Sequence, residues 1–387
     1  MLQPFSYAMP TRIVFGPGTV ARTGEELRSL ECHRPILVTD EGVGSLRFFA
    51  RLRDSITGAN LEYEVFDRVP RDPDLRDVDS LVALVRQKGC DSVVAIGGGS
   101  VLCAGRGAAV TLPSGGSARE LVGVDKVGND PLPMIAVPTT AGSGSEVSGV
   151  IVLSDRESGS IVTIGSPHCF PKLAILDPDA LADLPARQAA ISGMDALAHG
   201  LEALMTTTPN PLSEALAVHA CATIFKELPN AALTAESEPK ARCLVASTMA
   251  NMACGNSRLS LGHAMTLPLS ARFDIPHGVA AGLLLPHVVR FNLPVAGRRL
   301  LPLMRAMGYE PDVDPECILQ EIVSLLDDLD FPCCLQTLGV EESALAGMAG
   351  QVADSPLSKF NLRKAETSQV LSIYQAAFSA GRDRVVW

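Results

Sequence analysis

The first half of the chain alternates short apolar runs with helical segments, and this alternation restricts the possible folds more than any other feature. In order, the segments are PILVTD (35–40), VDSLVALVRQKG (78–89), DSVVAIGGGS (91–100) and PMIAVPTT (133–140). Runs rich in β-branched residues that alternate with amphipathic helices predict strands buried on both faces of a parallel sheet. Further apolar runs at 150–155 and 173–178 complete this half of the chain.

The pattern changes near DPDALADLP (177–185), where alanine- and leucine-rich segments begin that are typical of consecutive helices. They are AISGMDALAHGLEALM, SEALAVHACATIFKEL and KARCLVASTMANMACG. A chain of 387 residues exceeds what one hydrophobic core usually supports. We therefore expect an α/β domain at residues 1–183 and an all-helical domain at residues 184–387.

Charge and hydropathy narrow the range of partners. The formal charge is −11 and basic residues form no run, which argues against nucleic acid or an anionic membrane and favours a small molecule. No apolar stretch reaches the roughly 18 residues that span a bilayer, and the first residues do not resemble a signal peptide. The 10 cysteines are scattered without a CxxC pair, so most are expected to be reduced and buried. We expect a cytoplasmic protein.

A glycine-rich turn follows one buried run and opens a helical segment. Its backbone N–H groups could approach a phosphate closely, and a helix N-terminus favours negative charge. The turn does not have the GxGxxG spacing, so an ordinary strand-to-helix turn is the alternative. The candidate pyrophosphate-binding residues are Gly97, Gly98, Gly99 and Ser100.

Two further strand ends carry groups suited to a nucleotide. One is PTTAGSGSEV, which offers the hydroxyls of Thr139, Thr140 and Ser143. A helix N-cap is its alternative interpretation, because Glu146 follows Ser143 at the spacing of a capping box. The other is Asp40, whose carboxylate could accept from ribose hydroxyls and repel a 2′-phosphate, which favours NAD over NADP. An N-cap aspartate is the alternative there.

Four side chains in the second half form a candidate cation site. Asp195 and His199 are four residues apart, so on a helix they project from one face; a helical hydrogen-bonded pair has the same spacing. His263 lies in a helical segment, and His277 follows Pro276 at a predicted helix start. One carboxylate and three imidazoles can hold divalent iron or zinc and leave a position for a substrate oxygen.

In their order and spacing, these motifs resemble the iron-containing alcohol dehydrogenases, or group III metal-dependent dehydrogenases. The resemblance covers nearly the whole chain. The matching segments are FGPGTV, VTDEGV, AIGGGS, VPTTAGSGSEV, FPKLAILDPDAL, GMDALAHGLEAL, LGHAM and IPHGVAAGLLLPHVVRFN. It implies a dinucleotide-binding α/β domain followed by a helical metal-binding and catalytic domain, in a dehydroquinate synthase-like architecture. It also implies a homodimer or a larger homo-oligomer.

The resemblance implies a role for each candidate residue. The implied metal ligands, which would also form the catalytic centre, are Asp195, His199, His263 and His277. The implied cofactors are NAD(H) and a divalent metal, Fe²⁺ or Zn²⁺. NAD(H) would be bound by the glycine loop, the Thr139 segment and Asp40. The implied reaction interconverts a small primary or secondary alcohol and its aldehyde or ketone by metal-assisted hydride transfer.

Several positions depart from the usual family pattern. Leu267 replaces a further histidine, so a proton would have to move through another group such as the cofactor ribose, a water or Thr266. Cys103 and Arg106 replace an acid and a lysine after the glycine loop, and Ile161 replaces a nucleotide-contacting lysine. These changes affect the surroundings of the cofactor and substrate and leave the four implied ligands intact.

Other functions stay open. A dehydroquinate-synthase-like lyase also uses NAD and a divalent metal, but with a ligand set that includes glutamate. A catalytically impaired protein that still binds NAD and metal would account for Leu267 and Ile161. Among dehydrogenases, Arg258 and Arg272 would attract an anionic aldehyde if they point toward the substrate, whereas solvated surface arginines are the alternative.

Overall fold

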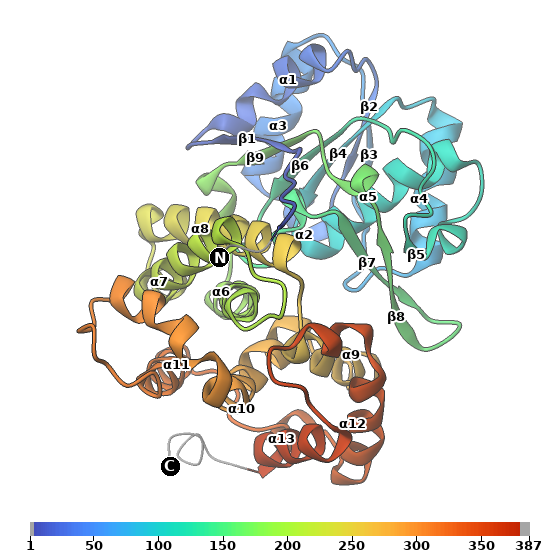
Figure 1. Ribbon diagram of the computed structural model, residues 1–387. Coiled ribbons are helices and arrows are strands. Elements are labelled where there is room, and N and C mark those ends of the chain that lie inside the picture. The colour runs from blue at the N-terminus through green and yellow to red at the C-terminus, as the bar shows by residue number, and fades with distance from the viewer. Residues whose placement is uncertain (1–3, 380–387) are drawn as a thin grey trace. The chain divides into compact units, whose positions relative to one another are not determined.

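The computed structural model describes residues 4–379, which divide into two compact units (Figure 1). One unit runs from Met9 to Leu184, and the other combines the residues up to Ala8 with those from Pro185 onward. Hydrogen bonds join the N-terminal segment to the helical unit: the Ala8 N–H donates to Asn256 Oδ1 at 2.8 Å, and Asn256 Nδ2 donates to the Ala8 carbonyl at 3.1 Å.

The α/β unit contains a six-stranded parallel sheet with the strand order β1-β9-β6-β4-β2-β3 (Figure 1). Its strands are β1 (Arg12–Phe15), β2 (Pro35–Val38), β3 (Glu64–Phe66), β4 (Ser92–Gly97), β6 (Met134–Pro138) and β9 (Leu173–Leu176). Every residue of β2, β4, β6 and β9 is buried, as expected for continuous apolar strands. The predicted parallel α/β sheet is confirmed, with the short edge strands β1 and β3 added to it.

The helices of this unit connect the strands. They are α1 (Thr23–Ser29), α2 (Glu41–Gly44), α3 (Arg47–Gly58), α4 (Leu75–Lys88) and α5 (Gly99–Ser114), with 3-10 helices η1 (Thr19–Arg22), η2 (Ala118–Leu121), η3 (Ser145–Val147), η4 (Pro167–Cys169) and η5 (Pro178–Leu181). Helix α4 begins at a capping box of Asp74 and Asp77 and ends at Gly89, whose φ of 65° is left-handed. Helix α5 packs against α4, β4 and β6, so its N-terminus is fixed at the end of a central strand.

The run at 150–155 lies in the α/β unit but belongs to a separate three-stranded sheet rather than to the parallel one. This sheet has the order β5-β8-β7, formed by β5 (Gly123–Val124), β7 (Val150–Asp155) and β8 (Ser160–Gly165). Strand β7 pairs with β8 in the antiparallel direction. Its residues Val150 and Val152 are 42% and 44% exposed while Ile151 and Leu153 are buried. β-branched residues suit both kinds of strand, so an apolar run of this length does not distinguish them.

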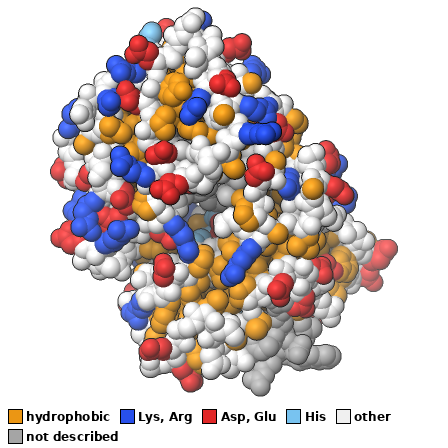
Figure 2. All heavy atoms as spheres, turned by 180° about the vertical axis from the view of Figure 1, so that it is seen from behind, with side chains coloured by type: hydrophobic (Ala, Val, Ile, Leu, Met, Phe, Trp, Pro, Cys, Tyr) orange, Lys and Arg blue, Asp and Glu red, His pale blue; other side chains and the backbone are white. Residues whose placement is uncertain are grey.

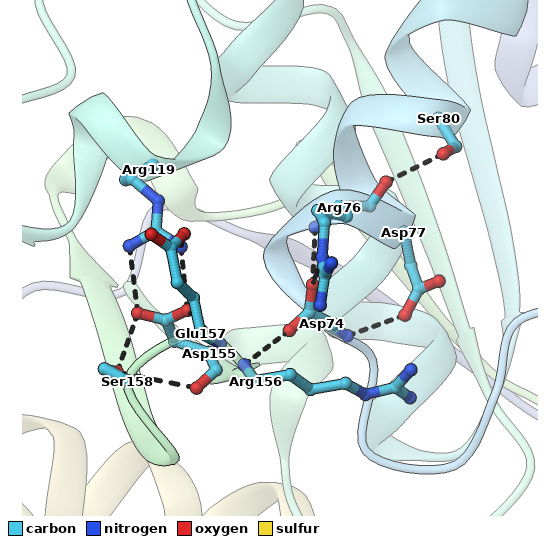
Figure 3. Close-up of polar contacts among 9 residues, drawn as sticks. All are labelled: Asp74, Arg76, Asp77, Ser80, Arg119, Asp155, Arg156, Glu157 and Ser158. Atoms are coloured by element: carbon cyan, nitrogen blue, oxygen red, sulfur yellow. Dashed lines mark hydrogen bonds and ion pairs between the residues drawn. The ribbon is translucent and has the colours of Figure 1, made fainter.

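Two buried carboxylates attach the β7–β8 hairpin to its neighbours (Figure 3). The Asp155 carboxylate accepts two hydrogen bonds from Arg119, at 2.8 and 3.0 Å, and a third from Ser158 Oγ at 2.7 Å. The Asp74 carboxylate accepts from the Arg156 N–H at 2.7 Å. The Arg119 guanidinium holds the pKa of Asp155 well below its ordinary range. The hairpin is therefore joined to η2 and to the start of α4.

The second unit is helical, as predicted, and its described residues form no strand beyond an isolated bridge. Its helices are α6 (Ala186–Leu204), α7 (Pro211–Leu233), α8 (Ser237–Ser257), α9 (Leu261–Phe273), α10 (His277–Ala306), α11 (Cys317–Asp328), α12 (Leu345–Asp354) and α13 (Thr367–Ser379), with 3-10 helices η6 (Gln336–Leu338), η7 (Glu342–Ala344) and η8 (Pro356–Phe360). Helix α6 packs against α7, α8 and α10, and α9 packs against α10 and α12. Helices α6, α9 and α10 carry the candidate metal ligands.

Helix α10 is long and apolar enough to cross a membrane by length and composition alone. However, 72% of its most apolar 18-residue stretch is buried in the described structure, and Pro286, Pro294 and Pro302 interrupt its backbone hydrogen bonding. Its apolar character is that of a core helix.

The surface drawn in Figure 2 carries acidic and basic side chains interspersed with one another. Neither sign forms an extended patch on this face. Large exposed apolar side chains come one or two at a time from separate elements, among them Phe15, Leu212 and Val295. This face therefore lacks the continuous basic surface that binds a nucleic acid backbone.

All 10 cysteines are free thiols, and only Cys317 and Cys333 are not buried. Burial raises the pKa of Cys169 to about 11 and that of Cys243 to about 12. Such thiols stay protonated at neutral pH and are poor nucleophiles. Most cysteines therefore act as small apolar core residues, as their scattered positions predict.

Candidate metal centre and cofactor-binding segments

Three helices of the helical unit bring Asp195, His263 and His277 together. Asp195 lies on α6, His263 near the start of α9, and His277 at the first position of α10. The Nε2 atoms of His263 and His277 lie 3.9 and 3.7 Å from Asp195 Oδ1. One potential ligand atom from each of the three residues lies within 4.8 Å of the other two. Ligand atoms about 2.1 Å from a tetrahedral cation lie roughly 3.4 Å apart, so a small contraction would accommodate one.

The turn between α9 and α10 explains how residues 14 positions apart come to adjoin. Helix α9 ends at Asp274, in a left-handed conformation with φ 53°, and Pro276 immediately precedes α10. Ile275 between them is buried and holds the turn against the core. The imidazole rings of His263 and His277 consequently lie 5.2 Å apart, centroid to centroid. The predicted helix start at His277 is confirmed.

Two of the three atoms are buried without any hydrogen-bond partner in the described part of the chain. They are Asp195 Oδ1 and His263 Nε2, on side chains that are almost fully enclosed. Leaving a buried polar atom unsatisfied costs roughly 1–3 kcal/mol, and more for a charged one. A cation between them would satisfy both atoms, so these residues fit a divalent metal by their chemistry and direction.

His199 lies beside this group on α6, one helical turn after Asp195. Its ring centroid is 4.4 Å from that of His263, and its Nδ1 lies 3.9 Å from Asp195 Oδ1. That Nδ1 is also buried without a partner among residues 4–379. Burial lowers the pKa of His199 to about 4, so its ring is neutral at pH 7, as a metal ligand must be. The close group contains three residues, and the set of four stays a prediction.

Glu202 is a site residue that the sequence analysis missed. Its Oε1 lies 2.7 Å from His263 Nδ1, and both side chains are buried. Burial alone would lower the pKa of His263, but the Glu202 carboxylate outweighs it and raises that pKa. The signal was present: Glu202 lies seven residues after Asp195 and three after His199, on one face of an otherwise apolar helix.

Thr266 makes the corresponding contact to the other histidine. Its buried hydroxyl donates to the His263 carbonyl at 2.8 Å, and it lies 3.1 Å from His277 Nδ1. A hydroxyl has one proton to donate, so Thr266 accepts from His277 rather than donating to it. This use of the hydroxyl disagrees with Thr266 as a free proton relay. Leu267, the next residue, is half-buried on α9.

In the α/β unit, the predicted cofactor residues gather at the carboxyl ends of the central strands. Strand β2 has β3 on one side and β4 on the other, so the chain reverses its direction of travel across the sheet between β2 and β4. Ligands of open α/β sheets bind outside such a switch point. Asp40 follows β2, and Gly97 ends β4. Thr139 follows β6, the next strand.

The glycine loop and the Thr139 segment lie in contact. The Thr139 N–H donates to the Gly97 carbonyl at 3.1 Å. A methyl group on Gly99 would lie 2.9 Å from Ser143 Oγ, and one on Gly98 would lie 3.4 Å from a Thr140 methyl carbon. A side chain on Gly99 would therefore require Ser143 to move, whereas one on Gly98 would touch Thr140 at about van der Waals distance. Helix α5 starts at this contact, and its N-cap Gly98 offers no side-chain acceptor to the first N–H groups.

Two alternative interpretations can be judged from the local geometry. Asp40 is an N-cap, because its Oδ1 accepts from the Val43 N–H at 2.9 Å, which leaves its second carboxylate oxygen for another donor. Ser143 Oγ accepts from the Ser145 N–H at 3.3 Å, but Ser143 is not the N-cap residue of a helix here. The segment forms only η3, whose N-cap is Gly144. Ser100, at the start of α5, accepts from the Asp72 N–H at 3.3 Å.

Arg106 and Cys103 serve the fold of the α/β unit. The Arg106 guanidinium is buried and donates to the carbonyls of Ser148 and Val150, at 2.6 and 2.9 Å, and to Cys103 Sγ at 3.5 Å. It therefore links α5 to the start of β7. Ile161 lies on β8, paired with Ser154 of β7, in the separate small sheet.

The two arginines near the candidate ligands differ in their surroundings. Both are exposed. The Arg272 guanidinium lies near Gly347, where an added Cβ would be 3.6 Å from its Nη1, and so it faces α12. Arg258 ends α8 with φ 74° and ψ 144°, a conformation rare outside glycine, and its guanidinium lies 5.9 Å from the Phe360 ring centroid.

A parallel sheet with a glycine loop at its switch point, together with a separate cluster suited to a cation, is the combination found in metal-dependent dinucleotide oxidoreductases. Comparison with known proteins defines the class further. The profile of the iron-containing alcohol dehydrogenases matches residues 10–178, and that of the C-terminal domain of the same enzymes matches residues 189–378. The chain belongs to the iron-containing alcohol dehydrogenase family.

Relatives of known activity and known structure extend over almost the full chain. 1,3-Propanediol dehydrogenase of Klebsiella pneumoniae is 32% identical, covering 97% of this chain and 99% of the relative. A solved 1,3-propanediol oxidoreductase has a TM-score of 0.94 at 31% identity, covering 97% of this chain and all of the other. Sulfoacetaldehyde reductase from Bifidobacterium kashiwanohense, solved in complex with NAD⁺, has a TM-score of 0.89 at 29% identity and covers 97% and 99%.

Family membership establishes the type of reaction. Enzymes of this family are NAD-dependent oxidoreductases of alcohols and aldehydes that use a divalent metal. The chain is therefore an iron-type alcohol dehydrogenase or aldehyde reductase acting on a small alcohol or aldehyde. The lyase alternative does not agree with this membership.

Proposed function

We propose that the enzyme transfers hydride between NAD(H) and a small alcohol or aldehyde at a divalent cation held by Asp195, His199, His263 and His277. The observation that supports this most is the convergence of Asp195 Oδ1, His263 Nε2 and His277 Nε2, two of them buried without a partner among the described residues. When bound, the cation supplies Lewis acidity toward the substrate oxygen. In this proposal residues 1–183 bind the cofactor and residues 184–387 bind the metal and carry out catalysis.

The chain's own groups prepare both ends of the reaction. The Asp195 carboxylate would partly neutralise the charge of the cation, and the neutral imidazoles would donate nitrogen lone pairs to it. In the α/β unit, the N-terminus of α5 and the loop of Gly97, Gly98, Gly99 and Ser100 bind the pyrophosphate, and Thr139, Thr140 and Ser143 bind the nearby nucleotide. The oxygen of Asp40 that does not cap α2 accepts from the adenosine ribose.

The main test measures cation binding and turnover in the same samples. Protein stripped with a chelator is titrated with Fe²⁺ under anaerobic conditions or with Zn²⁺, and NADH absorbance is followed with a panel of small aldehydes. We expect one cation per chain and turnover that depends on it. Asp195→Asn should lose both, whereas His168→Gln, on η4 of the α/β unit, should lose neither. Turnover that does not depend on the cation would contradict the proposal. Absence of turnover with every substrate would also contradict it and would favour a catalytically impaired binding protein.

The physiological metal is proposed to be Fe²⁺ or Zn²⁺. A carboxylate with imidazole nitrogens suits both ions, and supply in the cell often decides between them. Elemental analysis of protein purified anaerobically distinguishes them.

An anionic aldehyde is a second, narrower candidate for the substrate. Two observations favour it: the similarity to a sulfoacetaldehyde reductase, and the exposed Arg258 held in a strained conformation two residues before the N-cap of α9. Arg258→Gln should raise KM for a sulfonated or carboxylated aldehyde and leave a neutral one unchanged. Arg272→Gln is the matched control, because Arg272 faces α12. Equal KM changes for both substrates would contradict this candidate.

We also propose a cytoplasmic location and a homodimer or higher homo-oligomer. The burial of α10, which is that of a core helix, supports the cytoplasmic location. The resemblance to a family whose members usually assemble as oligomers supports the homo-oligomer. Cell fractionation and light scattering of the purified protein test them.

A further inference from the structure

The Glu202 carboxylate makes four hydrogen bonds at the start of α9. Its Oε2 accepts from the N–H and the hydroxyl of Ser260, at 2.6 and 2.8 Å. Its Oε1 accepts from the N–H of His263 at 2.8 Å and meets His263 Nδ1 at 2.7 Å. An ionised carboxylate can only accept hydrogen bonds, so each of these partners must donate to it. His263 therefore carries a proton on Nδ1.

The backbone of α9 leaves room for this carboxylate. A Cβ added to Gly262 would lie 2.3 Å from Glu202 Oε1. Any side chain at position 262 would overlap that oxygen and move Glu202 away from His263. The close approach of α6 to the start of α9 therefore depends on a glycine.

The same reasoning applies to His277 through Thr266. The Thr266 hydroxyl has its proton on the His263 carbonyl, so only a proton on His277 Nδ1 can complete the 3.1 Å contact. Both histidines then present unprotonated Nε2 atoms toward Asp195 Oδ1, at 3.9 and 3.7 Å. The result is two imidazole lone pairs and one carboxylate oxygen directed into the same space.

We propose that Glu202 and Thr266 are positioning residues that fix the tautomers and ring directions of His263 and His277, so that both Nε2 lone pairs face a divalent cation. The proposal rests on the proposed function for the presence of that cation. Outer partners of this kind commonly change metal affinity about 10–100-fold when removed. Neither residue touches the substrate in this account.

Two readouts test the proposal without using activity. The first is the histidine tautomer in metal-free, ¹⁵N-histidine-labelled protein, read from the ¹⁵N shifts and couplings of the ring nitrogens; the chain has 7 histidines to assign. The second is the affinity for Co²⁺, read from its visible absorption. We expect Nδ1–H tautomers for His263 and His277 in the wild-type protein. Glu202→Gln should bind Co²⁺ about 10–100-fold more weakly, because its amide N–H₂ must meet a donor.

Matched variants separate positioning from simple helix capping. Ser260→Ala removes a cap contact of Glu202 but leaves the His263 contact, so stability should fall while tautomer and Co²⁺ affinity stay as in the wild type. Thr266→Val should weaken Co²⁺ binding and release the His277 tautomer, and Thr266→Ser should restore both. The threonine pair keeps the test decisive if Glu202→Gln does not fold.

The outcomes differ for the two proposals. Unchanged Co²⁺ affinity and tautomers in both Glu202→Gln and Thr266→Val would overturn positioning while leaving the metal site in place. A wild-type protein that binds no Co²⁺, Fe²⁺ or Zn²⁺ would instead overturn the proposed function. In that case the tautomers of the metal-free protein still decide whether Glu202 and Thr266 orient the rings.

Discussion

Glu202 and His263 form a buried carboxylate–imidazole pair, with Oε1 and Nδ1 2.7 Å apart, at the junction of α6 and α9. The pair leaves His263 Nε2 without a hydrogen-bond partner among the described residues, on the side that faces Asp195. A single carboxylate thus stabilises the start of α9 and directs a candidate ligand. A change that moves the Glu202 carboxylate away from His263 should therefore affect stability and cation binding together.

Gly262→Ala is expected to lower both the stability of the protein and its affinity for the cation. The added methyl would lie 2.3 Å from Glu202 Oε1, so the carboxylate must move and lose contacts to His263. We expect the free energy of unfolding to fall by roughly 1–3 kcal/mol, with weaker cation binding. Denaturant unfolding and Co²⁺ titration measure these. Gly255→Ala on α8 is the control, because its methyl meets nothing within 4 Å and should stabilise the helix by roughly 0.5–1 kcal/mol. Equal effects of the two substitutions would contradict the prediction.

Removal of the cation should lower thermal stability. A ligand that binds only the folded state stabilises it by about 2.7 kcal/mol at a hundredfold excess over Kd. We expect a chelator to lower the Tm of metal-loaded protein and Zn²⁺ to restore it. In Asp195→Asn the Tm should no longer respond to either. Its Tm without metal should equal or exceed that of the metal-free wild type, since the substitution removes a buried negative charge whose Oδ1 has no hydrogen-bond partner among the described residues. A Tm response that persists in the variant would place the cation elsewhere.

The sequence allowed the parallel sheet and the helical second half to be predicted, because strands such as β4 are uniformly apolar and buried, and the helices are rich in alanine and leucine. It did not allow β7 to be placed in its separate sheet. The alternation of exposed Val150 with buried Ile151 depends on what covers each face, and both residues are apolar. Local composition indicates that a segment forms a strand but does not indicate which strands it pairs with.

The candidate site divides in the same way. The four-residue spacing identified Asp195 and His199 as candidate ligands, and the predicted helix start identified His277. Glu202 was not identified, although its spacing from Asp195 and His199 is visible in the sequence, and Thr266 was considered only for moving a proton. Their contacts with His263 and His277 depend on how α6, α9 and α10 pack, which the sequence pattern does not give. Arg106 was interpreted as a charge near the cofactor, whereas its guanidinium is occupied by backbone carbonyls.

His287 should make the helical unit sensitive to acid. It is buried within α10, and burial, with the neighbouring Arg290 cation, lowers its pKa to about 4 from an ordinary value of 6.5. Because the folded state disfavours the protonated ring, its contribution to stability is complete above about pH 6.5 and is lost as the pH falls toward 4. The loss amounts to roughly 3 kcal/mol. Denaturant unfolding of His287→Gln between these pH values should show a flatter pH dependence than the wild type. His219→Gln, on α7, should not.

Arg106→Met should destabilise the α/β unit without a direct effect on cofactor binding. The substitution leaves the carbonyls of Ser148 and Val150 without their donor, which costs roughly 2 kcal/mol. Under conditions where the variant is folded, NADH affinity measured by fluorescence should equal that of the wild type. Arg86→Met, at the exposed end of α4, is the control for stability. A loss of NADH affinity at unchanged stability would instead make Arg106 a cofactor residue.

Asp40→Asn should relax the preference for NADH over NADPH. The asparagine oxygen can still accept from the Val43 N–H, so the cap of α2 is kept and only the charge is removed. Without that charge a 2′-phosphate is no longer repelled, and we expect the ratio of kcat/KM values to shift toward NADPH by roughly tenfold, about 1.4 kcal/mol. Asp54→Asn, exposed on α3, should leave the ratio unchanged. If both variants keep the wild-type ratio, Asp40 acts only as a helix cap, and the preference for NAD must come from another part of the α/β unit.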